Sequence, residues 1–144
     1  MEQIISGVIL TPLKNIYNPA GNIYHCLKKT DAGFVDFGEA YFSTINTGVI
    51  KGWKKHLEAT LNIVVPRGQI RFVLYDDRED SETKGVFNDF TLSLDNFNRL
   101  TVPPNVWMAF QGVGGDNILL DITDLEHSPG EGVRVDLESI VYNW

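Results

Sequence analysis

The chain has 144 residues, of which 43% are hydrophobic and 22% are charged, and its formal net charge is −7. A chain of this length encloses one substantial core, so residues 1–144 are expected to form a single domain. The acidic balance argues against nucleic acid and anionic membranes as partners. The first ten residues contain no long apolar run, which predicts neither a signal peptide nor a membrane span and favours a cytoplasmic location.

Short segments rich in Val, Ile, Phe, Tyr and Thr follow one another along the chain, and each predicts a β-strand. These segments are 5–10, 23–27, 34–42, 62–65, 69–75, 86–94, 100–102, 106–111 and 118–122. Turn-forming residues separate them, for example the Pro-Arg-Gly at 66–68 and the Pro-Pro-Asn at 103–105. A helical turn is conceivable only at 54–61. The pattern predicts an all-β jelly-roll barrel.

Three further features have simple structural interpretations. The acidic run 76–82 is expected to be a solvated hairpin loop, and the glycine-rich stretch 112–115 a hairpin turn. Cys26 is the only cysteine, which excludes an internal disulfide. A histidine-based metal site inside such a barrel needs a His-x-His pair, a carboxylate and a later histidine, whereas this chain offers His56, Glu58 and Met108. We therefore expect no metal and no cofactor.

Several short motifs occur in the order in which one enzyme family carries them. They are GVIL at 7–10, NPAG at 18–21, FSTIN at 42–46, GVIKGWK at 48–54, VPP at 102–104 and GVRVD at 132–136. In this order they resemble the dTDP-4-dehydrorhamnose 3,5-epimerase family, and the resemblance covers nearly the whole chain. Members of that family are cupins, double-stranded β-helix barrels that act on nucleotide-linked 4-keto sugars. The resemblance implies that fold, a nucleotide-linked sugar as ligand and a homodimer.

The chain departs from the family at the catalytic positions. The matching position of the catalytic histidine is Lys54, and that of the proton-donating tyrosine is Leu120. A substrate-contacting histidine is replaced by Met108 and an arginine by Lys51. Asp136 matches the aspartate that orients the catalytic histidine.

The remaining catalytic candidates are Lys54, His56 and Asp136. If the segment is a strand, Lys54 and His56 point to one face and Lys55 to the other. A lysine acts as a base only when its surroundings lower its pKa, whereas an ordinary histidine has a pKa of about 6.5. We expect Lys54 or His56 to be the base and Asp136 to be its orienting partner.

The substrate-binding candidates are Asn46, Lys51, Trp53 and Gln111. Asn46 and Gln111 match positions near substrate contacts of the family, and Lys51 occupies an arginine position. Trp53 could stack on a base or a sugar, and Trp107 is expected to fill the core.

Two alternatives to an epimerase remain. An inactive sugar-nucleotide-binding or scaffolding cupin would have its interior filled by Trp107, Met108 and Leu120. A 3,4-ketoisomerase is the second alternative, because those relatives carry Arg-Gly-x-His-x-His and His56 retains the second histidine. The sequence does not decide whether the protein is an enzyme.

Overall fold

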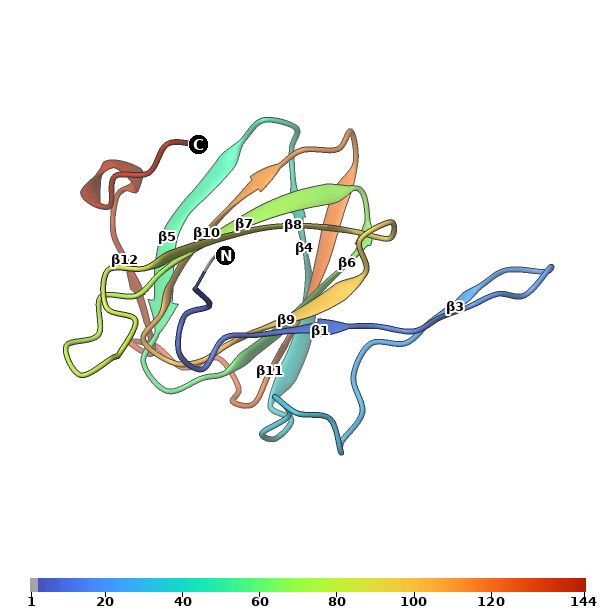
Figure 1. Ribbon diagram of the computed structural model, residues 1–144, viewed down its shortest axis with the longest axis horizontal. Helices are drawn as coiled ribbons and strands as arrows, with labels where there is room; N and C mark the ends of the chain where they lie inside the picture. Colours follow the sequence, from blue (N-terminus) through green and yellow to red (C-terminus); the bar gives the residue numbers. More distant parts are fainter. Residues whose placement is uncertain (1–2) are drawn as a thin grey trace.

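The computed structural model describes residues 3–144, which form two antiparallel five-stranded sheets that face each other (Figure 1). The first sheet has the order β1 (Ile9–Pro12), β9 (Asn98–Val102), β6 (Leu61–Arg67), β11 (Asn117–Thr123) and β4 (Glu39–Ile45). The second has the order β12 (Gly132–Arg134), β5 (Ile50–His56), β10 (Trp107–Gly112), β7 (Gln69–Tyr75) and β8 (Phe87–Ser93). The expected all-β architecture is confirmed.

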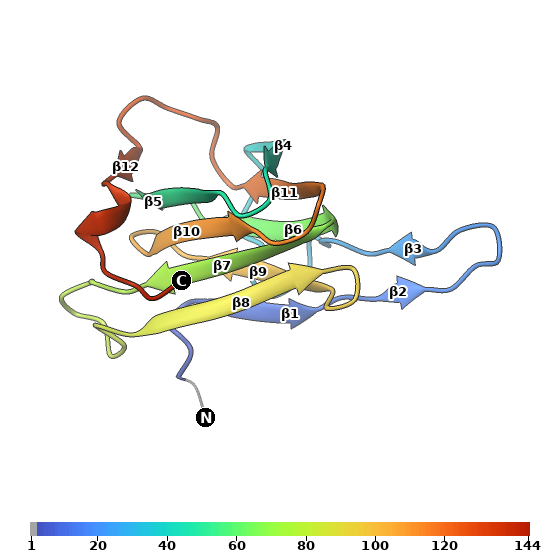
Figure 2. The same cartoon turned by 90° about the horizontal axis from the view of Figure 1, so that it is seen from above.

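A short hairpin of β2 (Asn15–Ile16) and β3 (Ile23–Tyr24) projects from the body as an arm (Figures 1 and 2). The chain returns from this arm through residues 25–38 to the edge strand β4. A single turn of 3-10 helix, Leu137–Ser139, follows β12. No helix of residues 3–144 has the length and apolar character that crossing a membrane requires.

Most predicted strands lie where the sequence placed them, and 69–75 coincides with β7. The strand β5 was not among the predicted segments. It contains Lys51, Lys54, Lys55 and His56, so its polar residues conceal the strand signal. The helical turn that was conceivable at 54–61 does not form, because Lys54 and Lys55 pair with β12 and Leu61 begins β6.

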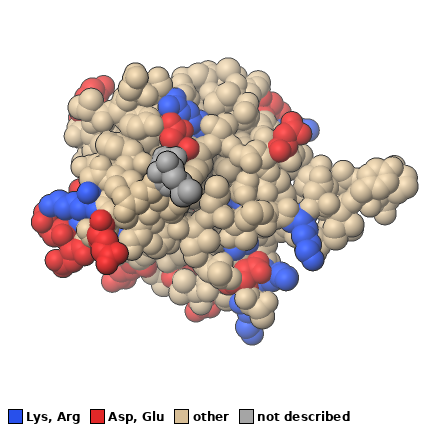
Figure 3. Space-filling model, in the orientation of Figure 1, with Lys and Arg blue, Asp and Glu red and all other residues tan. Residues whose placement is uncertain are grey.

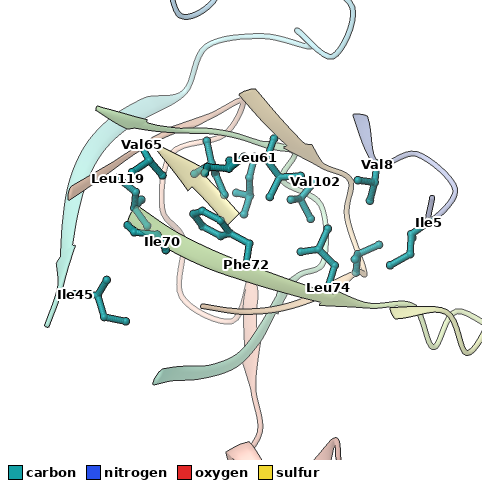
Figure 4. Packing of buried hydrophobic residues seen from close by; sticks show 14 residues of the cluster. Ile5, Val8, Ile45, Leu61, Val65, Ile70, Phe72, Leu74, Val102 and Leu119 are labelled. Carbon is teal, nitrogen blue, oxygen red and sulfur yellow. The ribbon is translucent and has the colours of Figure 1, made fainter. Parts of the chain in front are cut away.

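The main hydrophobic core lies between the two sheets (Figure 4). Alternate residues of β6 and β7 point inward, including Ile63 and Val65 from one sheet and Phe72 and Leu74 from the other. Burial of such side chains contributes about 1.5–3 kcal/mol each. The inward-facing positions of β5, β10 and β11 extend beyond this core and are available to line a cavity.

A second apolar cluster covers the outer face of the second sheet. Trp53 is 0% exposed there and packs with Trp107 beneath the C-terminal segment 135–144. The single Nε1–H of the Trp53 indole is shared between the carbonyl oxygens of Leu137 and Ile140, which both lie 3.2 Å from Nε1. These bonds fix the C-terminal segment against the back of β5.

Arg99 fastens the return segment from the arm onto the first sheet. Its guanidinium is 0% exposed and donates to Asn62 Oδ1 and to the carbonyl oxygens of Cys26 and Ala32. It also forms an ion pair of 3.2 Å with Asp31. A buried arginine with this many partners orders a segment that has little regular structure of its own.

Charged side chains gather at the loop between β7 and β8, whereas the tip of the arm carries none on the face shown in Figure 3. The expectation of a solvated acidic loop is correct for the exposed Glu79, Asp80 and Glu82. It is wrong for Asp76, which is buried and accepts hydrogen bonds from Arg78, Ser81 and Thr83. The loop therefore has an internal anchor.

Candidate active site

A cavity of about 380 Å³ opens between the sheets beside the main core. Its apolar lining includes Leu61, Ile63, Val106, Met108, Phe110 and Leu119, and its polar lining includes Glu39, Tyr41, Lys51, Lys54, His56, Asp121, Glu131 and Arg134. This volume falls in the range of small-molecule sites. Cationic side chains come from β5 and β12, whereas Tyr41 and Asp121 come from the facing sheet.

An irregularity in β5 directs three of its basic side chains into this cavity. In the pairing with β10, Met108 lies opposite Lys54 and Phe110 lies opposite Lys51, so β5 has one extra residue between them. Strict alternation would send Lys51 and Lys54 to opposite faces, but the bulge places both on the cavity side with His56. Lys55 lies on the outer face, with its Nζ 4.7 Å from the Trp107 ring centre.

His56 is held by a carboxylate. Its Nδ1 lies 2.6 Å from Glu131 Oε1, and Glu131 Oε2 also accepts a 2.9 Å hydrogen bond from the Leu57 backbone N–H. Burial would raise the pKa of Glu131, but these hydrogen bonds and the His56 charge lower it. Both side chains line the cavity. This carboxylate–histidine arrangement orients an imidazole for proton transfer.

Lys54 lies on the same wall as His56. Burial and the nearby Arg134 guanidinium lower the pKa of Lys54, while Glu131 and Asp121 oppose that change. A Cβ atom on Gly132 would lie 2.8 Å from Lys54 Cε, so a larger residue there would push the end of the lysine side chain out of its present position.

Lys51 closes one end of the cavity. Its Nζ donates to the carbonyl oxygen of Thr44 at 2.7 Å and to Ser43 Oγ at 3.2 Å, so it links β5 to β4. The Phe110 ring centre lies 5.7 Å from the same nitrogen.

A tyrosine–aspartate pair forms the opposite wall. Tyr41 and Asp121 face each other on β4 and β11, and the Tyr41 hydroxyl donates to Asp121 Oδ2 at 2.9 Å. Asp121 is only 4% exposed, and burial raises its pKa to about 6 even though the Tyr41 bond and Lys54 act in the other direction. Burial and the Asp121 charge raise the pKa of Tyr41.

Asp136 does not reach the cavity. It is exposed and precedes the 3-10 turn, outside the lining residues. The expected pairing with Lys54 or His56 is therefore corrected. The carboxylate beside His56 comes from Glu131, which directly precedes β12, while the C-terminal segment carries Asp136 around the outer face of the sheet.

Three expected substrate-binding residues also lie outside the cavity lining. Trp53 points to the opposite face of β5 from Lys54 and is enclosed by the C-terminal segment. Asn46 is exposed in the turn between β4 and β5. Gln111 follows Phe110 and points away from the cavity, with Nε2 3.5 Å from the Gly48 carbonyl oxygen. Strand alternation and the turn position account for all three placements.

The interior is not filled as an inactive barrel would require. Trp107 belongs to the outer cluster and does not fill the interior as expected, and Leu120 lies outside the lining, between Leu119 and Asp121, which both face the cavity. Of the three residues expected to fill the interior, only Met108 lines the cavity. The residue of β11 that faces Lys54 is Asp121 and not Leu120.

Sequence reasoning missed Tyr41, Asp121 and Glu131. A signal for Asp121 was present, since it alternates with Leu119 and Asn117 on the buried face of a strand. An acid at a buried position needs a partner or a function. Within residues 3–144 no group of three or more His, Cys, Asp and Glu side chains could hold a metal ion. The arrangement offers proton transfer between two polar walls.

Comparisons with known proteins agree on one class of relatives. No protein-family model matches the chain. A probable low-salt glycan biosynthesis epimerase of Haloferax volcanii is 32% identical over 116 residues, which are 76% of this chain and 74% of the relative.

Two solved structures share the fold. A dTDP sugar isomerase of Desulfovibrio desulfuricans superimposes with a TM-score of 0.90 and 36% identity, covering 94% of this chain and 87% of that one. A dTDP-4-dehydrorhamnose 3,5-epimerase of Sulfolobus tokodaii gives a TM-score of 0.85 and 26% identity, covering 98% of this chain and 84% of that one.

Proposed function

The chain belongs to the dTDP-4-dehydrorhamnose 3,5-epimerase-like family of cupins, and on that premise we propose that His56 and Lys54 carry out its chemistry on a nucleotide-linked 4-keto-deoxy sugar. It is a nucleotide-sugar epimerase/isomerase-like protein. The observation that carries the proposal is the pair of His56 Nδ1 and Glu131 Oε1, 2.6 Å apart in a cavity that Lys54 also lines.

His56 is the acid–base group of this proposal. A hydrogen on the carbon beside the C4 ketone is acidic only if the resulting negative charge on O4 is stabilised. Glu131 holds Nδ1 of His56, so Nε2 is the nitrogen left for the substrate. Glu131 then stabilises the imidazolium that forms when His56 takes up the proton.

Lys54 supplies the positive charge for O4. Burial and Arg134 lower the pKa of Lys54, but the carboxylates of Glu131 and Asp121 both act on it in favour of the ammonium form, and we assign that form on the strength of these two partners. An ammonium in a partly enclosed cavity between two sheets stabilises a developing enolate oxygen more strongly than it would in water. The epimerase and the 3,4-ketoisomerase alternatives share this step. An epimerase returns a proton to the carbon that lost it, whereas a ketoisomerase adds the proton to C4 while the O3 hydroxyl loses its proton to form the new carbonyl and O4 gains one.

The test is incubation with dTDP-, GDP- and CDP-linked 4-keto-6-deoxyglucose in deuterated water, followed by NMR. Deuterium at C3 or C5 marks epimerisation, and deuterium together with a shifted carbonyl marks ketoisomerisation. Absence of uptake with all three sugars contradicts the proposal and favours a binding protein.

Matched variants assign the residues. We expect Lys54→Met and His56→Asn to lower the rate at least about 100-fold, the range of a single acid–base or electrostatic group. The controls are Lys55→Met, the neighbouring lysine on the outer face, and His25→Asn, an exposed histidine. Equal losses in a variant and its control would refute the assignment.

The homodimer and the cytoplasmic location remain part of the proposal. Support for a dimer comes from exposed apolar side chains on the arm and near β4, namely Tyr17, Phe37 and Phe42. Light scattering at micromolar concentration is expected to give twice the 16.2 kDa mass of the chain, and a monomer would contradict the dimer.

A further inference from the structure

Asp121 has an unused carboxylate oxygen inside the cavity. Its Oδ2 accepts the Tyr41 hydroxyl, but Oδ1 is buried and has no hydrogen-bond partner among the residues that the structure describes. A buried carboxylate oxygen without a donor costs about 1–3 kcal/mol or more. Such an atom in a substrate-sized cavity is placed for a partner that arrives with the substrate.

The side chains around Asp121 provide no hydrogen-bond donor to its Oδ1 among the residues that the structure describes. Lys54 faces it from β5 and acts on its charge, yet the ion pairs of residues 3–144 do not include Lys54 with Asp121. On the neighbouring strand β6, the residue opposite Asp121 is Ile63, which does not titrate. The other titratable side chains of the cavity are Glu39 and Tyr41 on β4, Lys51 and His56 on β5, His127 and Glu131 in the loop between β11 and β12, and Arg134 on β12.

We infer that Asp121, held by Tyr41, is the second acid–base group of the reaction and serves the face of the sugar ring opposite to His56. This inference rests on the proposed function and extends it. His56 and Lys54 belong to the second sheet and Asp121 to the first, so a ring bound between the sheets has a proton acceptor on each side.

The proton balance closes with these groups. On one face a base takes the hydrogen of the carbon next to C4, the C–H electron pair forms the C=C bond, and the carbonyl π pair moves to O4 beside Lys54. On the other face the partner in its protonated form returns a proton to carbon, and the C4 carbonyl is restored. The acceptor then releases its proton and the donor regains one from water. Tyr41, which is 40% exposed, connects Asp121 to the solvent.

The acidity of Asp121 suits both directions. Burial raises its pKa to about 6, close to neutral pH, so the group exchanges protons at little cost. Tyr41 lowers that pKa by donating to the charged form, which makes it a positioning residue that also tunes Asp121.

The test separates proton exchange from product formation. Asp121→Asn and His56→Asn are each incubated with dTDP-4-keto-6-deoxyglucose in deuterated water, and uptake into unchanged substrate is compared with product. We expect both variants to lose product at least about 100-fold. Only one of the two variants should still incorporate deuterium into the starting sugar. It is the variant that keeps the side chain facing the C–H bond of that sugar.

Two outcomes would overturn the inference and leave the proposed function standing. One is product formation by Asp121→Asn within about threefold of the unmodified protein, and the other is the same exchange behaviour in both variants. Failure of the unmodified protein to exchange would instead refute the proposed function. A pH profile adds a readout that a purely structural role does not move. One limb of the kcat/KM profile should disappear in Asp121→Asn, because it reports the ionisation of Asp121. In Tyr41→Phe the same limb should move to higher pH, and an unchanged limb would refute the role of Tyr41.

Discussion

Replacing Asp121 with asparagine should make the protein more stable at neutral pH. Asparagine has nearly the same shape and can still accept the Tyr41 hydrogen bond, but it carries no charge to bury. The pKa of Asp121 rises from an ordinary 3.8 to about 6 because of burial. Each pKa unit corresponds to about 1.4 kcal/mol, so the ionised carboxylate costs roughly 3 kcal/mol in the folded state.

The sign follows from proton linkage. Between pH 3.8 and about 6 the folded protein binds a proton at Asp121 that the unfolded chain has released, so stability falls as pH rises through this window. The penalty is complete above it and disappears below it. Relative to the original protein, Asp121→Asn should therefore gain about 2 kcal/mol more at pH 7.5 than at pH 4.5. The cost of burying the amide is the same at both pH values and cancels in this comparison.

Urea unfolding followed by tryptophan fluorescence at the two pH values measures this difference. The control is Asp136→Asn, an exposed acid whose replacement should change stability by less than about 0.5 kcal/mol at either pH. A variant at Asp121 that is destabilised equally at pH 4.5 and pH 7.5 would show that the carboxylate is well compensated. The reasoning that treats it as a chemically poised group would then be wrong.

Three further substitutions test the supports of the site. Gly132→Ala should displace the Lys54 ammonium, since the new Cβ lies 2.8 Å from Lys54 Cε, and this should lower kcat about tenfold. The control is Gly115→Ala, where the new Cβ lies in open space, and its kcat should match that of the original protein. Trp53→Phe removes the single indole N–H that the Leu137 and Ile140 carbonyl oxygens share, and should lower the free energy of unfolding by about 1–3 kcal/mol. An unchanged free energy of unfolding would disprove that anchor. Arg99→Met leaves the buried Asn62 oxygen and two part-buried carbonyl oxygens without their donor and should cost about 3–5 kcal/mol by urea titration, whereas a loss below about 1 kcal/mol would contradict its role.

The site was only partly accessible to sequence reasoning. The expectation that Lys54 and His56 share a face and Lys55 takes the other agrees with their positions, because it depends only on the two-residue period of a strand. The same two-residue period places Trp53, which is next to Lys54, on the face away from the cavity. The expectation that Trp53 contacts the substrate overlooked this. Lys51 required more, because only the bulge in β5 brings it to the same side.

The sequence by itself determined the class of fold and the family. Strand-forming segments, turn residues and the order of short motifs are local features that survive in a single chain, and segment 69–75 matches β7. The partners of the catalytic candidates were decided by the tertiary structure. Asp121 meets Tyr41, 80 positions away, and His56 meets Glu131 rather than Asp136. Those contacts depend on sheet order, register and one extra residue in a strand, and the spacing of residues along the chain specifies none of them.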